Sequence, residues 1–85
     1  MTLSVNLDDL SQTAKDAVRL SFNPSQRADV QLLKSLAAAM ITVLEGVREE
    51  KTKTADGPSI YEVSTAITHI QTASMWSVLA ATKGS

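Results

Sequence analysis

Two long segments of this chain repeat apolar residues in steps of three and four, and one turn-rich stretch separates them. This spacing places the apolar side chains along one stripe of a helix. The stripe positions are Val30, Leu33, Ala37, Met40, Leu44 and Val47 in the first segment, and Ile60, Val63, Ile67, Ile70, Ser74, Val78 and Ala81 in the second. Two long helices joined by a short loop fold back antiparallel. The sequence therefore predicts an all-α fold built on a long antiparallel two-helix hairpin.

The turn of the hairpin is expected at residues 51–58, KTKTADGP, where Asp, Gly and Pro occur together. Immediately after it, Ser59 and Glu62 form an S-x-x-E capping box. In such a box each side chain bonds a backbone amide that the start of a helix leaves unpaired. We therefore expect the second long helix to span about residues 60–82.

The first long helix is expected to start at SFNPS, residues 21–25. Proline lacks an amide hydrogen and disfavours helical geometry in the residue before it, yet it fits the first turn of a new helix. Asn23 or Ser25 is therefore predicted to cap a helix that spans about residues 24–50.

A short amphipathic helix is predicted at about residues 7–20. Asn6 is placed to cap it, and Asp8 and Asp9 fall in its first turn, where the helix dipole favours negative charge. Its apolar face consists of Leu7, Leu10, Ala14 and Ala17. With the hairpin, this helix makes a single domain over residues 1–85.

Each helix of the hairpin has an uncharged part, residues 35–44 in the first and residues 63–82 in the second. If the turn centres near Thr54 and Ala55, residues whose numbers sum to about 109 or 110 lie side by side, and the two uncharged parts face each other. A hairpin hides only one stripe of each helix, so we expect the remaining small side chains to contact other subunits of a homo-oligomer. These are Ala38, Ala39, Thr42, Ala66, Ala73 and Ala80.

Charge and composition narrow the class of protein. Eight Lys and Arg residues against nine Asp and Glu residues give a formal net charge of -1, without the basic excess that long nucleic acid requires. The uncharged residues 63–82 include nine Ser, Thr, His or Gln residues, too polar for a membrane span. The N-terminus lacks the pattern of a secretory signal, so a cytoplasmic protein without nucleic-acid or membrane partners is expected.

Nothing in the sequence points to catalysis, a metal site or a cofactor. There are no cysteines, and His69, the one histidine, has no carboxylate at helical spacing except the distant Glu62. A metal site needs three or four ligands and a general base usually has an orienting partner. His69 is therefore interpreted as a structural or interfacial polar residue.

The motif FNPS allows two interpretations. An aromatic ring beside hydroxyl and amide side chains at a helix start suits a nucleobase and a phosphate, and Lys34 follows on the same helix. Alternatively, the motif is a plain helix cap with Phe22 as a hydrophobic staple and Lys34 a solvated lysine. Trp76, the sole tryptophan, is likewise expected in the core, with the wall of a base-stacking pocket as the alternative.

Residues 21–41 and 63–83 resemble the helical hairpin shared by phage anti-CBASS and anti-Thoeris sponge proteins. The residues that carry the resemblance are Phe22, Asn23, Pro24, Ser25, Lys34, Ser64, Ala66, Thr68, His69, Gln71, Met75 and Trp76. The resemblance implies a non-enzymatic, phage-encoded protein that sequesters cyclic nucleotide signals in the infected bacterial cell, so that defence effectors are not activated. Cyclic dinucleotides are the expected ligand, with cyclic ADP-ribose isomers and cyclic trinucleotides as further candidates.

The resemblance also implies a site and an assembly. The ligand would bind intact between subunits of a hexamer, with Phe22 stacking on a base and Lys34 meeting a phosphate. The implied ligand-binding residues are Phe22, Asn23, Pro24, Ser25, Lys34, Tyr61, Ser64 and Thr68. Tyr61 stands where family members often have an arginine associated with a trinucleotide pocket, and tyrosine cannot supply a positive fork for phosphates. Leu79 similarly replaces a lysine found in some members.

Two other classes of function remain open. One is a helical-hairpin module or phage adaptor that binds a protein partner and no nucleotide, which requires no role for Phe22 or Lys34. The other is an enzyme that cleaves the signal, which would release a linear product.

Overall fold

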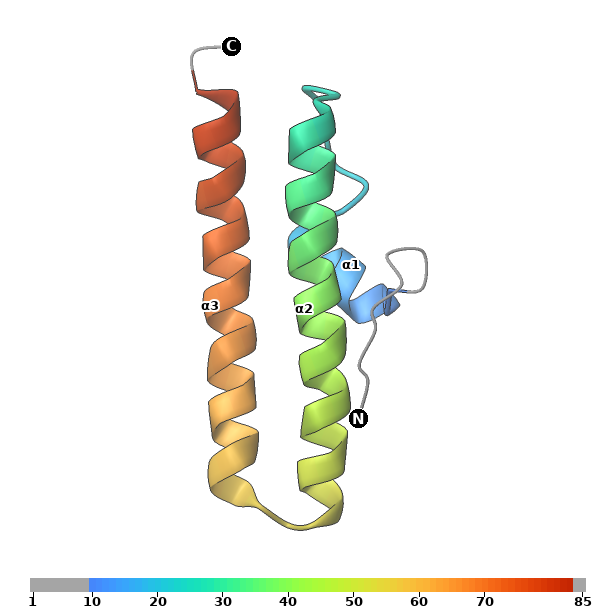
Figure 1. Cartoon of the computed structure of the whole chain (residues 1–85), viewed down its shortest axis with the longest axis vertical. Coiled ribbons are helices and arrows are strands. Elements are labelled where there is room, and N and C mark those ends of the chain that lie inside the picture. Colours follow the sequence, from blue (N-terminus) through green and yellow to red (C-terminus); the bar gives the residue numbers. More distant parts are fainter. Residues whose placement is uncertain (1–9, 84–85) are drawn as a thin grey trace.

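The computed structural model describes residues 10–83, and this part of the chain consists of three helices and no strand. They are α1 (Gln12–Val18), α2 (Ala28–Lys53) and α3 (Gly57–Thr82). α2 and α3 run antiparallel side by side, and α1 lies beside them near the middle of their length (Figure 1). The predicted hairpin of two long helices is therefore confirmed.

The buried stripe of α2 differs from the predicted one. Val30, Ala37 and Ile41 are buried, whereas Met40 is 57% exposed. In α3, Val63 and Ser74 are buried as expected. The stripe of α2 follows steps of four, three and four residues through Val30, Lys34, Ala37 and Ile41, because α2 buries side chains against both α1 and α3.

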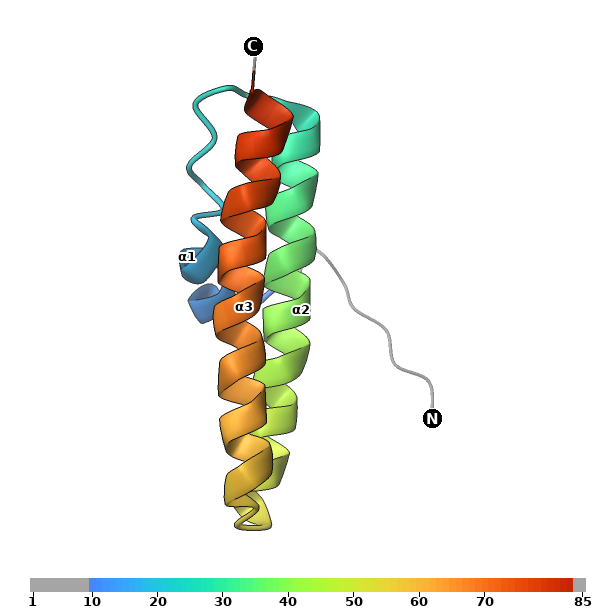
Figure 2. The same cartoon turned by 90° about the vertical axis from the view of Figure 1, so that its left-hand side faces the viewer.

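α1 packs mainly against α2, on one side of the hairpin (Figure 2). Leu10, Ala14 and Val18 form one apolar cluster with Ala38 and its neighbours on α2. Ala38 and Ala14 are fully buried, and such small side chains allow the two helices to approach closely.

The contacts of α1 correct part of the predicted subunit interface. Ala38 and Ala39 are buried within the chain. The Ser11 amide donates to Thr42 Oγ1 at 3.3 Å. Ala38 and Ala39 are therefore not available to another subunit, and Thr42 is bonded to the segment before α1. Ala73 and Ala80 are exposed in the single chain, and Ala66 is half-buried.

α1 begins at Gln12, later than the predicted helix. Ser11 caps it, since Ser11 Oγ accepts the Ala14 amide at 3.1 Å. The expected cap Asn6 and the first-turn residues Asp8 and Asp9 lie outside the described residues. The helix ends at Val18 because Arg19 adopts a left-handed conformation with φ 53°.

The prediction that Asn23 or Ser25 caps α2 is wrong. Pro24 instead occupies the second position of a β-turn, in which the Gln26 amide donates to the Asn23 carbonyl at 3.0 Å. Gln26 is left-handed, with φ 55°, so an α-helix cannot pass through it. α2 consequently begins at Ala28 with Arg27 at the N-cap, and it continues to Lys53.

The capping box at Ser59 and Glu62 is also wrong. The N-cap of α3 is Asp56, whose carboxylate accepts the Ser59 amide at 3.3 Å and the Ser59 hydroxyl at 2.7 Å. Pro58 fits in the first turn, where no intrahelical amide is needed. α3 therefore starts at Gly57, three residues before the predicted start.

Several large apolar side chains are exposed in the single chain. On α2 they form what we call the apolar stripe: Leu32, Leu36, Met40 and Val43, each 41–57% exposed. Leu36 and Met40 are each two residues from Ala38, about 200° around the helix, so the stripe faces away from α1. Trp76 on α3 is 64% exposed, which contradicts its expected place in the core.

By length and apolar composition alone, α2 is the one helix among the described residues that would be able to cross a membrane. The uncharged part of α3 does not meet the same criteria. In this structure α2 packs against both α1 and α3.

Candidate functional site

A groove of about 520 Å³ lies at the end of the hairpin opposite its turn. We call it the Phe22 groove. It is lined by Phe22, Asn23, Pro24, Ser25, Arg27, Val30, Lys34, Val78 and Thr82. Its volume lies in the range of about 300 to 1,000 Å³ that small-molecule sites occupy. The loop before α2, the first turns of α2 and the last turns of α3 therefore meet around a space large enough for a small ligand.

The structure divides the predicted site residues into two groups. Phe22, Asn23, Pro24, Ser25 and Lys34 all line the Phe22 groove. The other three, Tyr61, Ser64 and Thr68, lie on α3 toward the turn of the hairpin and do not line it. At 1.5 Å per residue, Thr68 is about 21 Å along α3 from Thr82. A single chain therefore does not bring the two groups together.

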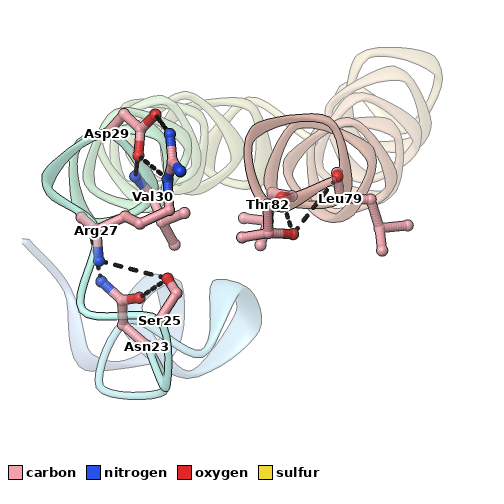
Figure 3. Close-up of polar contacts among 8 residues, drawn as sticks. Asn23, Ser25, Arg27, Asp29, Val30, Leu79 and Thr82 are labelled. Carbon is pink, nitrogen blue, oxygen red and sulfur yellow. Dashed lines mark hydrogen bonds and ion pairs between the residues drawn. The ribbon is translucent and has the colours of Figure 1, made fainter. Parts of the chain in front are cut away.

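Hydrogen bonds within the loop hold its polar side chains in place (Figure 3). Ser25 Oγ donates to Asn23 Oδ1 at 2.8 Å, and Asn23 Nδ2 donates to the Arg27 carbonyl at 3.0 Å. The Arg27 amide donates to Ser25 Oγ at 3.4 Å. The loop is thus tied to the start of α2 by its own side chains.

The ring of Phe22 is open to solvent. It is 60% exposed. A hydrophobic staple would pack the ring against the first turn of a helix, and such a ring would be largely covered. The exposed aromatic face suits a planar ligand group better than it suits a staple.

Lys34 is buried, and its ammonium is engaged by the protein. Its residue exposure is 6%, and Nζ donates to the carbonyl of Arg19 at 3.0 Å and to the carbonyl of Phe22. Burial lowers the pKa of Lys34 below its usual value, and the positive charge of Arg19 adds to the effect. The interpretation of Lys34 as a solvated lysine is therefore wrong.

Arg27 is the second cation of the groove, and it is not among the site residues predicted from the sequence. Its guanidinium forms a two-pronged ion pair with Asp29, from Nε to Oδ1 at 3.0 Å and from Nη2 to Oδ2 at 2.8 Å. The hydrogen bond to Arg27 lowers the pKa of Asp29 below its ordinary value. The sequence signal that would have revealed Arg27 is its position two residues after FNPS.

Val78 and Thr82 of α3 were also missed. They reach the groove from the opposite helix, and Figure 3 shows Thr82 across from Arg27 and Val30. The expected register pairs residues whose numbers sum to about 110, which places the end of α3 beside the start of α2. By that register, Val30 lies beside the part of α3 that contains Val78, and Arg27 lies beside Thr82.

His69 is exposed on α3, beside an apolar groove that also includes Met40 and Ile70. Within residues 10–83, no group of three or more His, Cys, Asp or Glu side chains is arranged to hold a metal ion. In the Phe22 groove, aromatic, polar and cationic side chains line one space that α2 and α3 share.

Comparison with known proteins gives one match. The model of the family described as "Acb2/Tad1, hairpin domain" matches residues 12–82. Neither the curated proteins nor the solved structures gave a match. The family match covers all three described helices and the loop that carries Phe22. This chain therefore belongs to the Acb2/Tad1 hairpin-domain family, the family of anti-CBASS and anti-Thoeris sponge proteins.

Proposed function

We propose that this protein sequesters cyclic dinucleotides without cleaving them, and that the ligand binds in the Phe22 groove. Membership of the family implies the role of a cyclic nucleotide sponge. The observation that carries the proposal is the convergence of five implied site residues on one groove: Phe22, Asn23, Pro24, Ser25 and Lys34. In the cytoplasm of an infected bacterium, such binding deprives defence effectors of their activator.

The lining of the groove suits both parts of a nucleotide. The exposed ring of Phe22 stacks on a base, a contact worth about 1–3 kcal/mol per base. Val78 of α3 adds an apolar side chain to the lining. Arg27 and Lys34 place two positive charges at the groove, which favours a ligand with phosphodiester groups.

The described residues that line the groove favour binding over turnover. They include no Asp, Glu or His that would act as a general base toward a bound ligand. Release of the intact ligand from denatured protein is therefore expected. A cyclic dinucleotide is favoured over a cyclic trinucleotide, because Tyr61 supplies no positive charge.

We also propose a homo-oligomer, with the hexamer of the family as the expected state. The apolar stripe on α2 and the exposed Trp76 support this proposal, because contiguous apolar surface of this kind is typical of subunit contacts. In such an assembly Tyr61, Ser64 and Thr68 are proposed to reach the ligand from a neighbouring subunit.

Calorimetry against a panel of cyclic di- and trinucleotides and cyclic ADP-ribose isomers tests the proposed function. We expect saturable binding of at least one cyclic dinucleotide. After incubation the protein is denatured, and the ligand is recovered and identified by mass spectrometry. No binding to any member of the panel, with protein shown to be oligomeric, would refute the sponge. Recovery of a linear product would instead show an enzyme.

A second candidate function is a module that binds a protein partner. The apolar stripe favours it too, since the stripe offers the same surface to any apolar partner. The two functions differ at Phe22 and Lys34, which only the sponge requires. A chain that is monomeric at micromolar concentration and binds no nucleotide would favour the module.

A further inference from the structure

The two cations that line the Phe22 groove differ in how available they are to a ligand. Lys34 is 6% exposed, and two of the three donors of its ammonium are used by the carbonyls of Arg19 and Phe22. A ligand phosphate that replaced these bonds would leave two backbone carbonyls without their donor. Such a replacement carries a desolvation penalty.

The side chain of Arg27 is 40% exposed, and its hydrogen bonds to Asp29 are made at the surface. Asp29 does not line the groove, and its side chain is 50% exposed. If Arg27 leaves Asp29, water can solvate the carboxylate, so the exchange does not bury an unpaired charge.

We propose that Arg27 binds a phosphodiester group of the ligand in the Phe22 groove, that Asp29 competes for it, and that Lys34 positions the loop. This inference rests on the proposed function. It assigns a phosphodiester contact to a residue that the family resemblance does not single out.

Arg27 makes the same number of hydrogen bonds before and after it exchanges Asp29 for the ligand. The guanidinium presents parallel N–H donors, and a carboxylate and a phosphodiester both accept them in pairs. Arg27 therefore gives up two hydrogen bonds to Asp29 Oδ1 and Oδ2 and gains two to phosphate oxygens. Asp29 keeps the bond that it accepts from the Val30 amide at 2.8 Å, so it stays in place beside the exchanged partner.

The two residues of the pair should have opposite effects on affinity. Removing the guanidinium removes the contact, whereas removing the carboxylate charge releases Arg27 to the ligand. Arg27→Gln is expected to weaken cyclic dinucleotide binding by about 10-fold or more, the scale of a hydrogen bond to a charged group. Asp29→Asn is expected to strengthen binding several-fold. Arg27→Lys keeps the charge but loses the fork, so an intermediate loss is expected.

The experiment measures dissociation constants by calorimetry for wild type and the three variants, with cyclic di-AMP, cyclic di-GMP and cyclic GMP–AMP as probes. Thermal melts by circular dichroism show whether each variant is folded. Should Arg27→Gln fail to fold, the affinities of Arg27→Lys and Asp29→Asn test whether Arg27 binds the phosphodiester group. Adenosine serves as a probe without phosphate, and its binding should be the same in wild type and Arg27→Gln.

The outcomes separate this inference from the proposed function. If wild type binds none of the three probes, the proposed function and the inference both fail. If wild type binds a probe and Arg27→Gln binds it equally well, the inference alone fails. Unchanged affinity in Asp29→Asn would overturn the competition. Opposite shifts in the two variants would support the whole proposal.

Discussion

The ammonium of Lys34 lies 5.5 Å from the centroid of the Phe22 ring and donates a hydrogen bond to the carbonyl of the same residue. The side chain of Lys34 on α2 thus contacts both the backbone and the ring of Phe22 in the loop. A cation at this distance from an aromatic ring is attracted to it. The position of the Phe22 ring therefore depends on Lys34.

Lys34→Met is expected to loosen the loop. The substitution keeps an apolar stem of similar length but removes the donor to the Arg19 and Phe22 carbonyls. Amide hydrogen exchange at Phe22, whose amide donates to the Arg19 carbonyl at 2.9 Å, should become faster. Lys53→Met, at an exposed lysine near the turn, is the matched control. Equal exchange in wild type and Lys34→Met would contradict a positioning role.

Phe22→Ala is expected to weaken cyclic dinucleotide binding about 5-fold to 150-fold, because a base stacked on an aromatic ring is worth about 1–3 kcal/mol. Phe22→Tyr keeps the ring and should bind within a few-fold of wild type. Calorimetry measures both variants. If Phe22→Ala retains wild-type affinity, the base does not stack on this ring and the ligand site lies elsewhere.

Met40→Glu is expected to disrupt the proposed oligomer, because it places a charge within the apolar stripe. Light scattering with size-exclusion chromatography measures the mass, and the emission of Trp76, 64% exposed in the single chain, reports on its surroundings. Thr13→Glu introduces the same charge at an exposed position of α1 and should leave the mass unchanged. A Met40→Glu variant with the mass of wild type would exclude the stripe as the subunit contact.

Ile41→Ala is expected to lower the free energy of unfolding by about 2–5 kcal/mol, and Ile41→Val by about 0.5–1.5 kcal/mol. Ile41 is 1% exposed and belongs to the cluster that joins α1 to α2. Urea denaturation at a fixed protein concentration measures both values. A loss no larger for Ile41→Ala than for Ile41→Val would show that this cluster contributes little to stability.

Acid should destabilise the protein partly through Asp56. Hydrogen bonds from the side chain and amide of Ser59 lower the pKa of Asp56 below its ordinary value. A carboxylate whose folded pKa is lowered contributes stability above its unfolded pKa, and this contribution is lost as pH falls through the folded pKa. In thermal melts between pH 7 and pH 2, wild type should lose more stability below about pH 4 than Asp56→Asn, which keeps an amide cap without a titratable group. Parallel pH curves for the two proteins would contradict this.

The hairpin was predictable because its signal is distributed over many residues. The steps of three and four and the cluster at Asp56, Gly57 and Pro58 indicate the same architecture independently. The structure buries Ile41 where the sequence predicted Met40. This difference changes which side chains are buried, but the predicted hairpin stays the same. The start of a helix depends on single residues. Pro24 fits the first turn of a helix and also a β-turn, and Ser59 fits an N-cap and also a position in the first turn. The predicted starts of α2 and α3 were therefore both wrong.

The candidate site was only partly predictable. Phe22 and Lys34 were selected, but the sequence could not show that Lys34 is buried, because that depends on the loop folding back over it. The sequence places Pro24 at the start of the helix, but in the structure Pro24 belongs to the loop. The helix therefore starts later, and Arg27 becomes its N-cap at the edge of the groove. The alanines at 38 and 39 were assigned to subunit contacts because the sequence does not reveal which surface the short α1 covers.

The Phe22 groove lies where no covalent turn joins α2 to α3, and it includes Val78 and Thr82 near the last residues of α3. Helix ends fray more readily than helix centres. A bound ligand that contacts both helices would act there as a second, reversible cross-link. Saturation should therefore slow hydrogen exchange in the last turn of α3 more than near Pro58, where the chain itself already closes the hairpin.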